Sequence, residues 1–556
     1  MACNLLSKFL GAVYRIPLLK VLGSEGLGLY QLIFPIYALV LVICSSGITV
    51  ALSKFISKEV RYKNSHNLKT LLKASFIISA SVSTILSLIF CLISRPLSVY
   101  QGEVSLFYCY LAIVPSIVLS TLISTFKGYF LGKNKMIYSG SLQIVSQIAK
   151  LFFSLLLANI FAKNGIVFAV LGAVLGITIS EIITLLVATI IYFSKKSNSM
   201  VIYGKIKNTN EINVSKCASV NKLKNANGFT KIISLETDKN KLVLKTESRY
   251  LTLKNAIKKV VKFGLFVSLE ACIIPLTGAL DSILVVPLLI KSGLTKQLAF
   301  TLFGLEDGIV YSLVCMPTVF ASSISSSLIP NIKSLSKENT STNKNISESI
   351  KIVWLISLAC ALIFIFFSKD IIKFLYSNNF SDKIVDEFYV VENLLKFNAF
   401  SIIYLSLLNL STSILQGLEQ SKKPLINLGI SALIRLILIL ILIPINGINI
   451  YGLAVADVVF YSLSFVLNLR EIKKSIDIKF SLKNFILTPV VCASIMCLSM
   501  KFLNLSLGGL LPAKVLTLFM LLIGVLIYIS LLLFTKVIDV QEIKNKIFRR
   551  KIIQNS

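Results

Sequence analysis

The stretch LFMLLIGVLIYISLLL, at residues 518–533, contains no charged residue and lies between Lys514 and Lys536. A helix of about 20 apolar residues, rising about 1.5 Å per residue, crosses the ~30 Å hydrocarbon core of a bilayer. A strand of a membrane barrel instead alternates apolar and polar residues over about 10 positions, and this run does not alternate. The stretch therefore predicts a transmembrane helix.

Comparable apolar runs recur along the whole chain, such as ILILILIPI at residues 437–445. Of the 556 residues, 55% are hydrophobic and 15% are charged, which is too apolar for an ordinary soluble domain. We therefore expect an all-α membrane protein of about fourteen transmembrane helices. These helices are predicted at residues 3–22, 28–53, 70–93, 104–127, 137–162, 165–194, 256–290, 298–330, 350–368, 388–418, 424–446, 450–469, 483–504 and 512–535.

Basic residues are concentrated in every second connection between these helices. The connections after the even-numbered helices contain, among others, Lys58, Lys127, Lys133, Lys337, Lys423 and Lys473. Loops rich in Lys and Arg stay on the cytoplasmic side of a membrane. We therefore expect a multi-pass protein of the cytoplasmic (inner) cell membrane with both termini in the cytoplasm.

The predicted helices form two sets of six, separated by a polar insert and followed by two more helices. The expected organisation is an N-terminal lobe at 1–194, an insert at 195–255, a C-terminal lobe at 256–470, two helices within 471–536 and a basic cytoplasmic tail at 537–556. Between Lys195 and Lys262 the chain holds 16 Lys and Arg residues against 4 Asp and Glu residues. Such an insert is typical of a solvated cytoplasmic loop attracted to anionic lipid head groups, and a docking site for a partner is the alternative.

The two sets of six helices resemble each other at matching places. SSGITVALSKFIS at 45–57 aligns with SSISSSLIPNIKS at 322–334, and LGITISE, which ends at Glu181, aligns with YGLAVAD, which ends at Asp457. Because each set has an even number of spans, the repeat is parallel and its pseudo-twofold axis lies along the membrane normal. The repeat predicts two pseudo-symmetric lobes with a cavity between them, and chance similarity among apolar helices is the alternative.

Several ionisable residues fall inside the predicted helices, where each costs about 2.5 to 3.5 kcal/mol unless it meets a partner or a watery cavity. The cations are Lys8, Arg15, Lys150 and Arg435. The acids are Glu181, Glu270, Asp281, Glu306, Asp307 and Asp457. The cations are candidates for binding a pyrophosphate, and pairing with nearby acids or snorkelling to the interface is the alternative. For the acids we expect structural pairing, with coupling to an ion as the second possibility.

The sequence contains no pattern typical of a metal, nucleotide or nucleic-acid site. The ten cysteines form no C-x-x-C pair, and His66 is the sole histidine. Gly128, Gly132 and Lys133 fall one residue short of a phosphate-binding loop, so we expect a helix-packing contact there. The net charge of +32 is spread over short blocks between apolar runs rather than over one folded face. We therefore expect neither a metal nor a cofactor, and no nucleic-acid partner.

The opening of the chain resembles a known family. SKFLGAVYRIPLLKVLGSEGLGLYQLIFPIY at 7–37, followed by SSGITVALSKFISKE, is similar to the start of the stage V sporulation protein B group of polysaccharide flippases. That group belongs to the multidrug/oligosaccharidyl-lipid/polysaccharide (MOP) exporter superfamily, together with the lipid II flippase MurJ. The resemblance extends to the stretch at 126–135, to Glu181 and to GALDSILVVPLLI at 278–290.

The resemblance implies a V-shaped fold of two lobes and export of a lipid-linked oligosaccharide by alternating access. It also implies that Lys8 and Arg15 bind the pyrophosphate, with Lys8 standing where lipid II flippases usually carry Arg. We therefore expect a flippase, not an enzyme, for an undecaprenyl-pyrophosphate-linked precursor of spore cortex or peptidoglycan. Its expected partners are this lipid-linked substrate, the bilayer and, as candidates, cell-wall synthesis proteins.

Three other functions remain as alternatives. A cation-coupled multidrug extruder of the same superfamily would be expected to use acidic cavity residues in its first lobe, where this sequence is basic. A membrane glycosyltransferase or polymerase would need a catalytic carboxylate near large outer loops, and the predicted outer loops are short. A non-transporting scaffold of spore-wall assembly differs from a flippase only in a transport assay.

Overall fold

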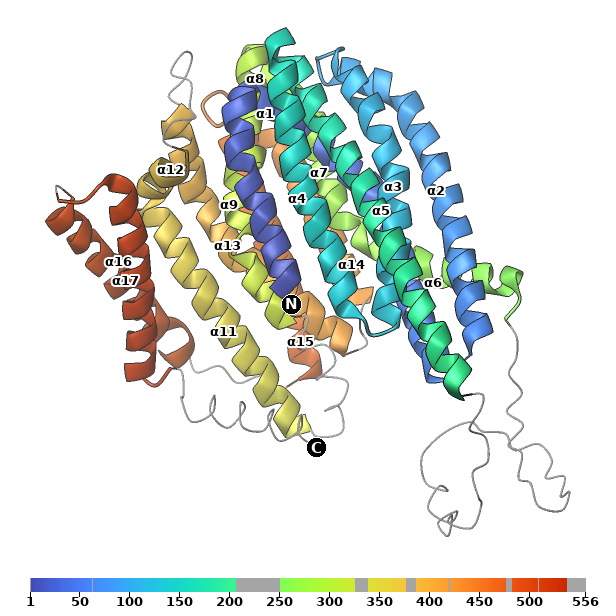
Figure 1. Ribbon diagram of the computed structural model, residues 1–556. Helices are drawn as coiled ribbons and strands as arrows, with labels where there is room; N and C mark the ends of the chain where they lie inside the picture. The colour runs from blue at the N-terminus through green and yellow to red at the C-terminus, as the bar shows by residue number, and fades with distance from the viewer. Residues whose placement is uncertain are drawn as a thin grey trace, which may run out of the picture.

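The computed structural model describes residues 2–62, 64–206, 251–325, 339–376, 387–418, 420, 422–476, 483–508 and 510–537. Within these ranges the chain is almost entirely helical (Figure 1). Thirteen of the described helices are long and apolar enough to cross a membrane. Most of the predicted insert, from residue 207 to 250, and the tail from residue 538 lie outside the described residues.

The first long helix, α1 (Ala2–Arg61), is two spans that meet at Gly23. This residue has φ 69° and ψ 176°, a conformation outside the helical region that glycine adopts at little cost. Residues on either side of it contact the same partners: Tyr14 and Phe34 both face Lys150, and Arg15 and Gln31 both contact Asp307. In a straight helix Arg15 and Gln31 would be about 24 Å apart. The chain therefore folds back at Gly23, and if α1 is counted as two spans, the thirteen candidate helices of the described residues agree with the prediction of about fourteen.

The other helices of the first set pack closely around α1. They are α2 (Ser65–Tyr100), α3 (Leu106–Gly132), α4 (Met136–Phe161) and α5 (Ile166–Ile206), with a short 3-10 turn η1 (Ala162–Asn164) before α5. A side chain at Gly128 would place its Cβ 2.8 Å from the carbonyl oxygen of Thr49, and one at Gly132 would lie 2.7 Å from Ile56. The two glycines thus lie at a close contact between α3 and α1.

The second set begins with α6 (Leu253–Ala271) and α7 (Ile273–Lys291), which the sequence predicted as one helix. The next span contains α8 (Lys296–Phe303), a π-helical segment η4 (Gly304–Val310) and α9 (Tyr311–Cys315). The set continues with α11 (Asn339–Phe366), α12 (Ser368–Tyr376), α13 (Glu387–Gly417), α14 (Lys422–Leu442) and α15 (Tyr451–Ser475). The last two spans, η5 (Lys483–Leu487) with α16 (Thr488–Leu507) and α17 (Ala513–Phe534), pair at one side of the bundle (Figure 1).

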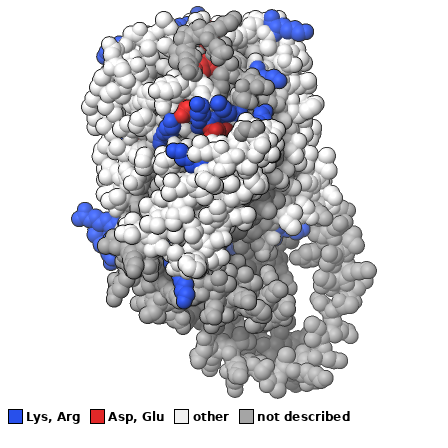
Figure 2. Space-filling view, turned by 90° about the vertical axis from the view of Figure 1, so that its left-hand side faces the viewer, with Lys and Arg blue, Asp and Glu red and all other residues white. Residues whose placement is uncertain are grey.

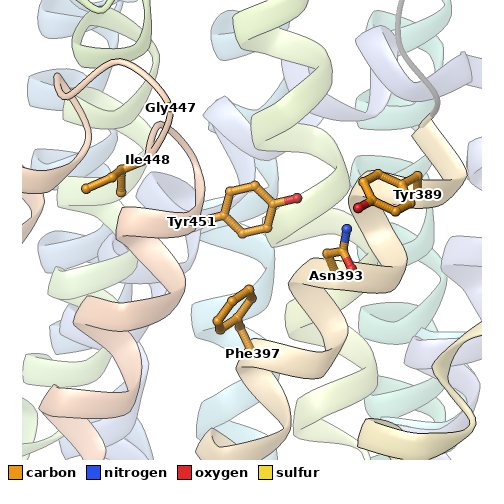
Figure 3. A pocket seen from close by; sticks show the side chains of 6 residues that line it. All are labelled: Tyr389, Asn393, Phe397, Gly447, Ile448 and Tyr451. Carbon is orange, nitrogen blue, oxygen red and sulfur yellow. The ribbon is translucent and has the colours of Figure 1, made fainter.

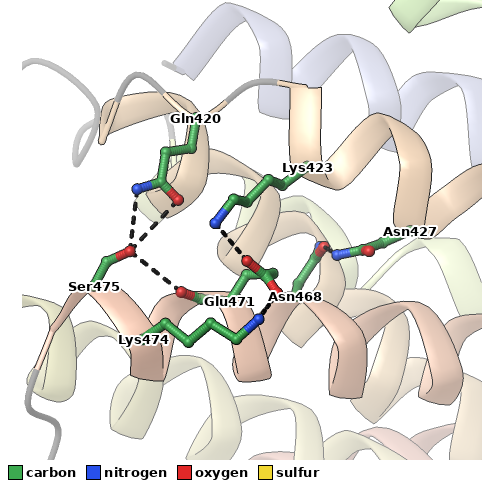
Figure 4. A network of polar contacts seen from close by, with 7 residues as sticks. All are labelled: Gln420, Lys423, Asn427, Asn468, Glu471, Lys474 and Ser475. Atoms are coloured by element: carbon green, nitrogen blue, oxygen red, sulfur yellow. Dashed lines mark hydrogen bonds and ion pairs between the residues drawn. The ribbon is translucent and has the colours of Figure 1, made fainter.

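A polar network joins α14 and α15 where α14 begins and α15 ends (Figure 4). Glu471 accepts hydrogen bonds from Lys423 and from Lys474, the latter at 2.6 Å. Asn427 donates to the side-chain oxygen of Asn468 at 2.9 Å. Side-chain hydrogen bonds of this kind hold neighbouring helices together in a membrane.

The two sets are joined by polar contacts at the end of the bundle where α1 folds back, called here the Gly23 end. Lys296 pairs with Glu103 at 3.0 Å, and Gln101 donates to the carbonyl oxygen of Ser282 at 3.0 Å. Ser24 donates to the carboxylate of Glu387. These contacts link α1 and the α2–α3 turn to α7, α8 and α13, so the two sets are held together at this end.

Candidate functional site

Lys150 of α4 lies in the first set with its ammonium group against two aromatic rings. Its Nζ is 4.4 Å from the ring centroid of Phe34 and 5.5 Å from that of Tyr14. A ring face attracts a cation, but by only about 0.5 to 2 kcal/mol. Among the described residues Lys150 makes neither a hydrogen bond nor an ion pair within 4 Å. Its charge is therefore not neutralised by direct contact with a carboxylate.

Arg15 of α1 bridges the two sets without pairing to a carboxylate. Its Nη1 donates to the backbone carbonyl oxygens of Asp307 and Gly308, both at 2.8 Å. Both acceptors lie in η4, and π-helical turns are frequent at functional sites because they disturb the regular helix. Arg15 thus keeps a full positive charge beside Lys150, with only neutral acceptors in direct contact.

Glu181 of α5 is the acid of the first set. It accepts a hydrogen bond from Ser146 of α4 at 3.3 Å. It also attracts Lys150 and Lys127 electrostatically, although neither lysine comes within ion-pair distance of it in the described part of the chain. Glu181 therefore faces two cations without forming a contact ion pair with either of them.

The position predicted for Lys127 from the sequence is wrong. The prediction ended the fourth helix at residue 127 and assigned Lys127 to a cytoplasmic loop. In the structure α3 continues to Gly132, so Lys127 lies inside the helix, half-buried, and within electrostatic reach of Glu181. The signal was present in the sequence, because the apolar run continues through Tyr129, Phe130 and Leu131 after the charged residue.

Arg435 of α14 is fully paired in the second set. Its Nη1 and Nη2 donate to the two carboxylate oxygens of Asp281 at 2.7 Å each, and its Nε donates to Asp457 at 2.6 Å. All three side chains are buried, and Arg435 is 5% exposed. The forked contact with Asp281 uses the planar geometry of the guanidinium group. Arg435 is thus held by acids from α7 and α15.

Glu306 and Asp307 of η4 add two further acids to this group, of which Glu306 is buried and Asp307 is half-buried. Glu306 is 2% exposed, and one of its oxygens accepts from Asn398 of α13 at 2.7 Å, while Oε2 has no hydrogen-bond partner among the described residues. Asp307 accepts from Gln31 of α1 at 2.6 Å. The second set therefore holds four acids around one arginine.

The structure thus brings together eight of the ten predicted side chains in two groups. Arg15, Lys150 and Glu181 lie in the first set, and Asp281, Glu306, Asp307, Arg435 and Asp457 lie in the second. Lys8 is in α1 and Glu270 is in α6, but their side chains lie outside the described part of the structure. The groups meet where Arg15 contacts η4, and their net charges have opposite sign.

Other polar features lie on α13 and at the start of α15. A cavity of 440 Å³ is lined by Tyr389, Asn393 and Phe397 of α13 and by Tyr451 at the start of α15, with Gly447 and Ile448 beside them (Figure 3). Figure 2 shows one face of the molecule, on which charged side chains gather mainly in its upper half. On α13, Lys396 pairs with Glu392 at 2.6 Å.

Within the described residues no group of three or more His, Cys, Asp or Glu residues has the arrangement of a metal site.

Comparison with known proteins gives matches along most of the chain. A family model described as polysaccharide biosynthesis protein matches residues 1–212, and one described as lipid II flippase MurJ matches residues 310–526. The stage V sporulation protein B of Bacillus subtilis (strain 168) is 23% identical over 497 residues, which cover 88% of this chain and 85% of that protein. An uncharacterized membrane protein of the same organism, YabM, is 22% identical over 475 residues, covering 85% of this chain and 78% of that protein.

Solved structures with a similar fold include a flippase and a multidrug transporter. The lipid II flippase MurJ in an inward closed conformation aligns with a TM-score of 0.66 and 14% identity over 99% of both chains. An inward-facing multidrug resistance MATE family transporter of the MOP superfamily aligns with a TM-score of 0.61 and 13% identity, over 84% of this chain and 95% of that one. At these identities the likeness concerns the fold alone.

Proposed function

Because the chain belongs to the polysaccharide and lipid II flippase group of the MOP exporter superfamily, we propose that it moves an undecaprenyl-pyrophosphate-linked cell-wall precursor across the cytoplasmic membrane. Families of this group are transporters rather than enzymes, and their substrates are linked to lipid. The finer proposal is that the head group carries a pyrophosphate and that the precursor serves spore cortex or peptidoglycan synthesis.

One observation carries the proposal: Arg15 and Lys150 are cations inside the bundle, and no carboxylate of the described residues is in direct contact with either of them. Lys150 is held by ring faces, and Arg15 is held by two backbone carbonyl oxygens. Leaving a cation at membrane depth without an anion is costly. An anionic substrate repays that cost, because charge-assisted hydrogen bonds to phosphate are stronger than those to neutral carbonyl groups. We assign both residues to head-group binding.

We assign Arg435 a structural role in place of substrate binding. Each of its three nitrogens donates to Asp281 or Asp457, so a phosphate that bound in the same way would have to displace two buried carboxylates. We assign the remaining acids of the second set to pairing or to coupling with a cation. Glu306, which has one unpartnered oxygen, is the candidate for coupling.

The transport cycle that we propose starts at the end of the bundle opposite Gly23. With both termini in the cytoplasm, as the basic loops predict, the Gly23 end faces outward. In the structure, three contacts hold the two sets together at the outer side: Lys296–Glu103, Gln101–Ser282 and Ser24–Glu387. The head group then enters from the cytoplasm, the outer contacts separate, and the head group leaves while the prenyl tail stays in lipid.

The charge of the first set distinguishes this proposal from multidrug extrusion. A transporter of cationic drugs needs acids where the drug binds, whereas the first set combines Arg15, Lys127 and Lys150 with Glu181 alone among the residues described at the site. The acids of the second set are largely engaged with Arg435, Asn398 and Gln31. A scaffold without transport activity is excluded only by a transport assay.

The test is reconstitution of the purified protein in liposomes with fluorescent lipid II and, separately, other lipid-linked glycans. Wild type should move at least one of them, and both Arg15→Ala and Lys150→Met should reduce the rate at least tenfold. Lys135→Met, which removes an exposed lysine, is the matched control and should be active. Because methionine suits the aromatic surroundings of Lys150, its variant should keep the thermal stability of wild type. Full activity of both variants would remove these residues from the site.

A further inference from the structure

Three cations of the first set lie at successive depths along the bundle. Lys127 is five residues before the end of α3 at Gly132, about 8 Å along the helix axis. Lys150 is fourteen residues after the start of α4 at Met136, about 21 Å from the same end of the bundle. Arg15 precedes the fold-back by eight residues and lies about 12 Å from the Gly23 end. The cations thus follow one another from the end opposite Gly23 towards it.

We propose that Lys127 makes the first contact with the diphosphate head group of the lipid-linked substrate, before the head group reaches Lys150 and Arg15. This inference rests on the proposed function and adds a second binding position to it. Of these three cations Lys127 is nearest to the end from which loading is proposed, and it lies inside a span rather than in a solvated loop. The first position is therefore Lys127, and the second is formed by Lys150 and Arg15.

Equivalent positions of the two sets differ in a way that supports a ligand in the first set. Lys150 and Glu181 occupy places in the repeat that correspond to Arg435 and Asp457. In the second set this cation and this acid are in direct contact at 2.6 Å. In the first set the same two positions form no ion pair within 4 Å, and Glu181 hydrogen-bonds to Ser146 instead. The second set neutralises its cation internally, whereas the first set leaves two lysines for an external anion.

The charge balance of the first set fits a diphosphate. Arg15, Lys127 and Lys150 carry three positive charges against the single negative charge of Glu181, so the group has a net charge of about +2. A pyrophosphate diester carries two negative charges. Glu181 attracts both lysines, and we infer that it keeps them oriented towards the pathway while the substrate is absent. The flexible ammonium of a lysine suits a transient contact, because it binds phosphate as a point charge without fixed geometry.

The experiment measures binding of undecaprenyl pyrophosphate to the purified full-length protein in detergent, with undecaprenol as the uncharged control. Lys127→Met should raise the Kd for undecaprenyl pyrophosphate about tenfold, and Lys127→Arg should keep it within about twofold of wild type. Lys135→Met removes an equal charge from the exposed turn after α3 and should leave the Kd unchanged. Thermal unfolding of each variant reports whether it is folded.

A double variant separates substrate binding from a purely structural role. If Lys127 only neutralises Glu181, then Lys127→Met combined with Glu181→Gln should restore the wild-type Kd, and this result would overturn the inference. If Lys127 binds the diphosphate, the double variant should stay as weak as Lys127→Met. If Lys127→Met keeps the wild-type Kd, the inference about Lys127 is overturned and the proposed function is not. Failure of the wild type to bind undecaprenyl pyrophosphate more tightly than undecaprenol would overturn the proposed function as well.

Discussion

Two cations inside the bundle, the buried Arg435 and the half-buried Lys150, occupy corresponding positions of a repeat and yet have opposite surroundings. Arg435 is enclosed by two carboxylates, whereas Lys150 lies against two aromatic rings. Removing one member of a buried ion pair leaves the other member as an uncompensated charge. Replacing a lysine that has no ion-pair partner by an apolar side chain leaves no such charge. Substitution by methionine should therefore leave the stability of the protein unchanged at Lys150 and lower it at Arg435.

Arg435→Met is expected to destabilise the protein strongly. It would leave Asp281 and Asp457 buried without their cation, which costs about 3 to 5 kcal/mol in other proteins. The measurement is the thermal unfolding of the purified variant in detergent. Combining Arg435→Met with Asp281→Asn and Asp457→Asn should recover much of the loss, because no buried charge remains. Wild-type stability of the single variant would show that the ion pairs do not hold α7, α14 and α15 together.

At the level of elements, small residues decide how closely the two sets approach each other. Gly28 of α1 lies against α8, and a Cβ at this position would be 1.9 Å from the carbonyl oxygen of Phe300. A Cβ added at Gly304 of η4 would likewise lie 2.4 Å from the backbone nitrogen of Gly28. Because backbone atoms cannot move aside as a flexible side chain can, any larger residue must separate the two spans. The closed Gly23 end therefore depends on two glycines.

Gly28→Ala should open the Gly23 end. The probe is Ser24→Cys, introduced in a background without native cysteines, because Ser24 is buried at this end beside Glu387. A membrane-impermeant maleimide added outside intact cells should label the cysteine several times faster when Gly28→Ala is present. Gly429→Ala is the matched control, since no atom lies within 4 Å of a Cβ there. Equal labelling rates in the three backgrounds would contradict this account of how the end is closed.

Across the whole molecule, charge is distributed asymmetrically between the two sets. The first set is positive at the site, and the second set holds four acids around Arg435. Under the proposed function, an anionic head group binds from one side only and carries its own negative charge across the membrane. Moving one charge through the membrane potential changes its free energy by about 2.3 kcal/mol per 100 mV.

Transport should accelerate when the interior is negative. A dianionic head group that crosses the whole field outward gains about twice the single-charge value, or ~5 kcal/mol per 100 mV. The measurement uses proteoliposomes with a potassium diffusion potential set by valinomycin and a fluorescent lipid-linked substrate that the assay shows to be transported. Reversing the sign of the potential should slow outward movement. A rate that is independent of the sign would mean that positive charge moves with the head group and cancels the effect.

The sequence alone determined the class of this protein and much of its arrangement. Continuous apolar runs predicted an all-α membrane protein of about fourteen transmembrane helices, and the opening motif predicted its superfamily. The helical membrane fold, with thirteen candidate spans among the described residues, and the superfamily are confirmed. These features depend on transfer of successive residues from water to lipid, which is a local property of the chain. The exact lobe boundaries and the cytoplasmic position of the termini stay predictions.

Only the tertiary structure decided which of the buried charges meet. Arg435 finds Asp281, 154 positions away, and Arg15 finds the carbonyl oxygens of η4 nearly 300 positions away. The sequence places Lys127 in a loop if a charge ends a span, whereas α3 continues past it and packs against α5, which leaves Lys127 half-buried inside the helix. Contacts of this kind depend on the depth and rotation of each helix against its neighbours. The hydropathy of the sequence gives neither the depth nor the rotation of a helix. It therefore located the charged residues within the spans but did not show that, among the described residues, Arg435 is paired with acids whereas Arg15 and Lys150 are not.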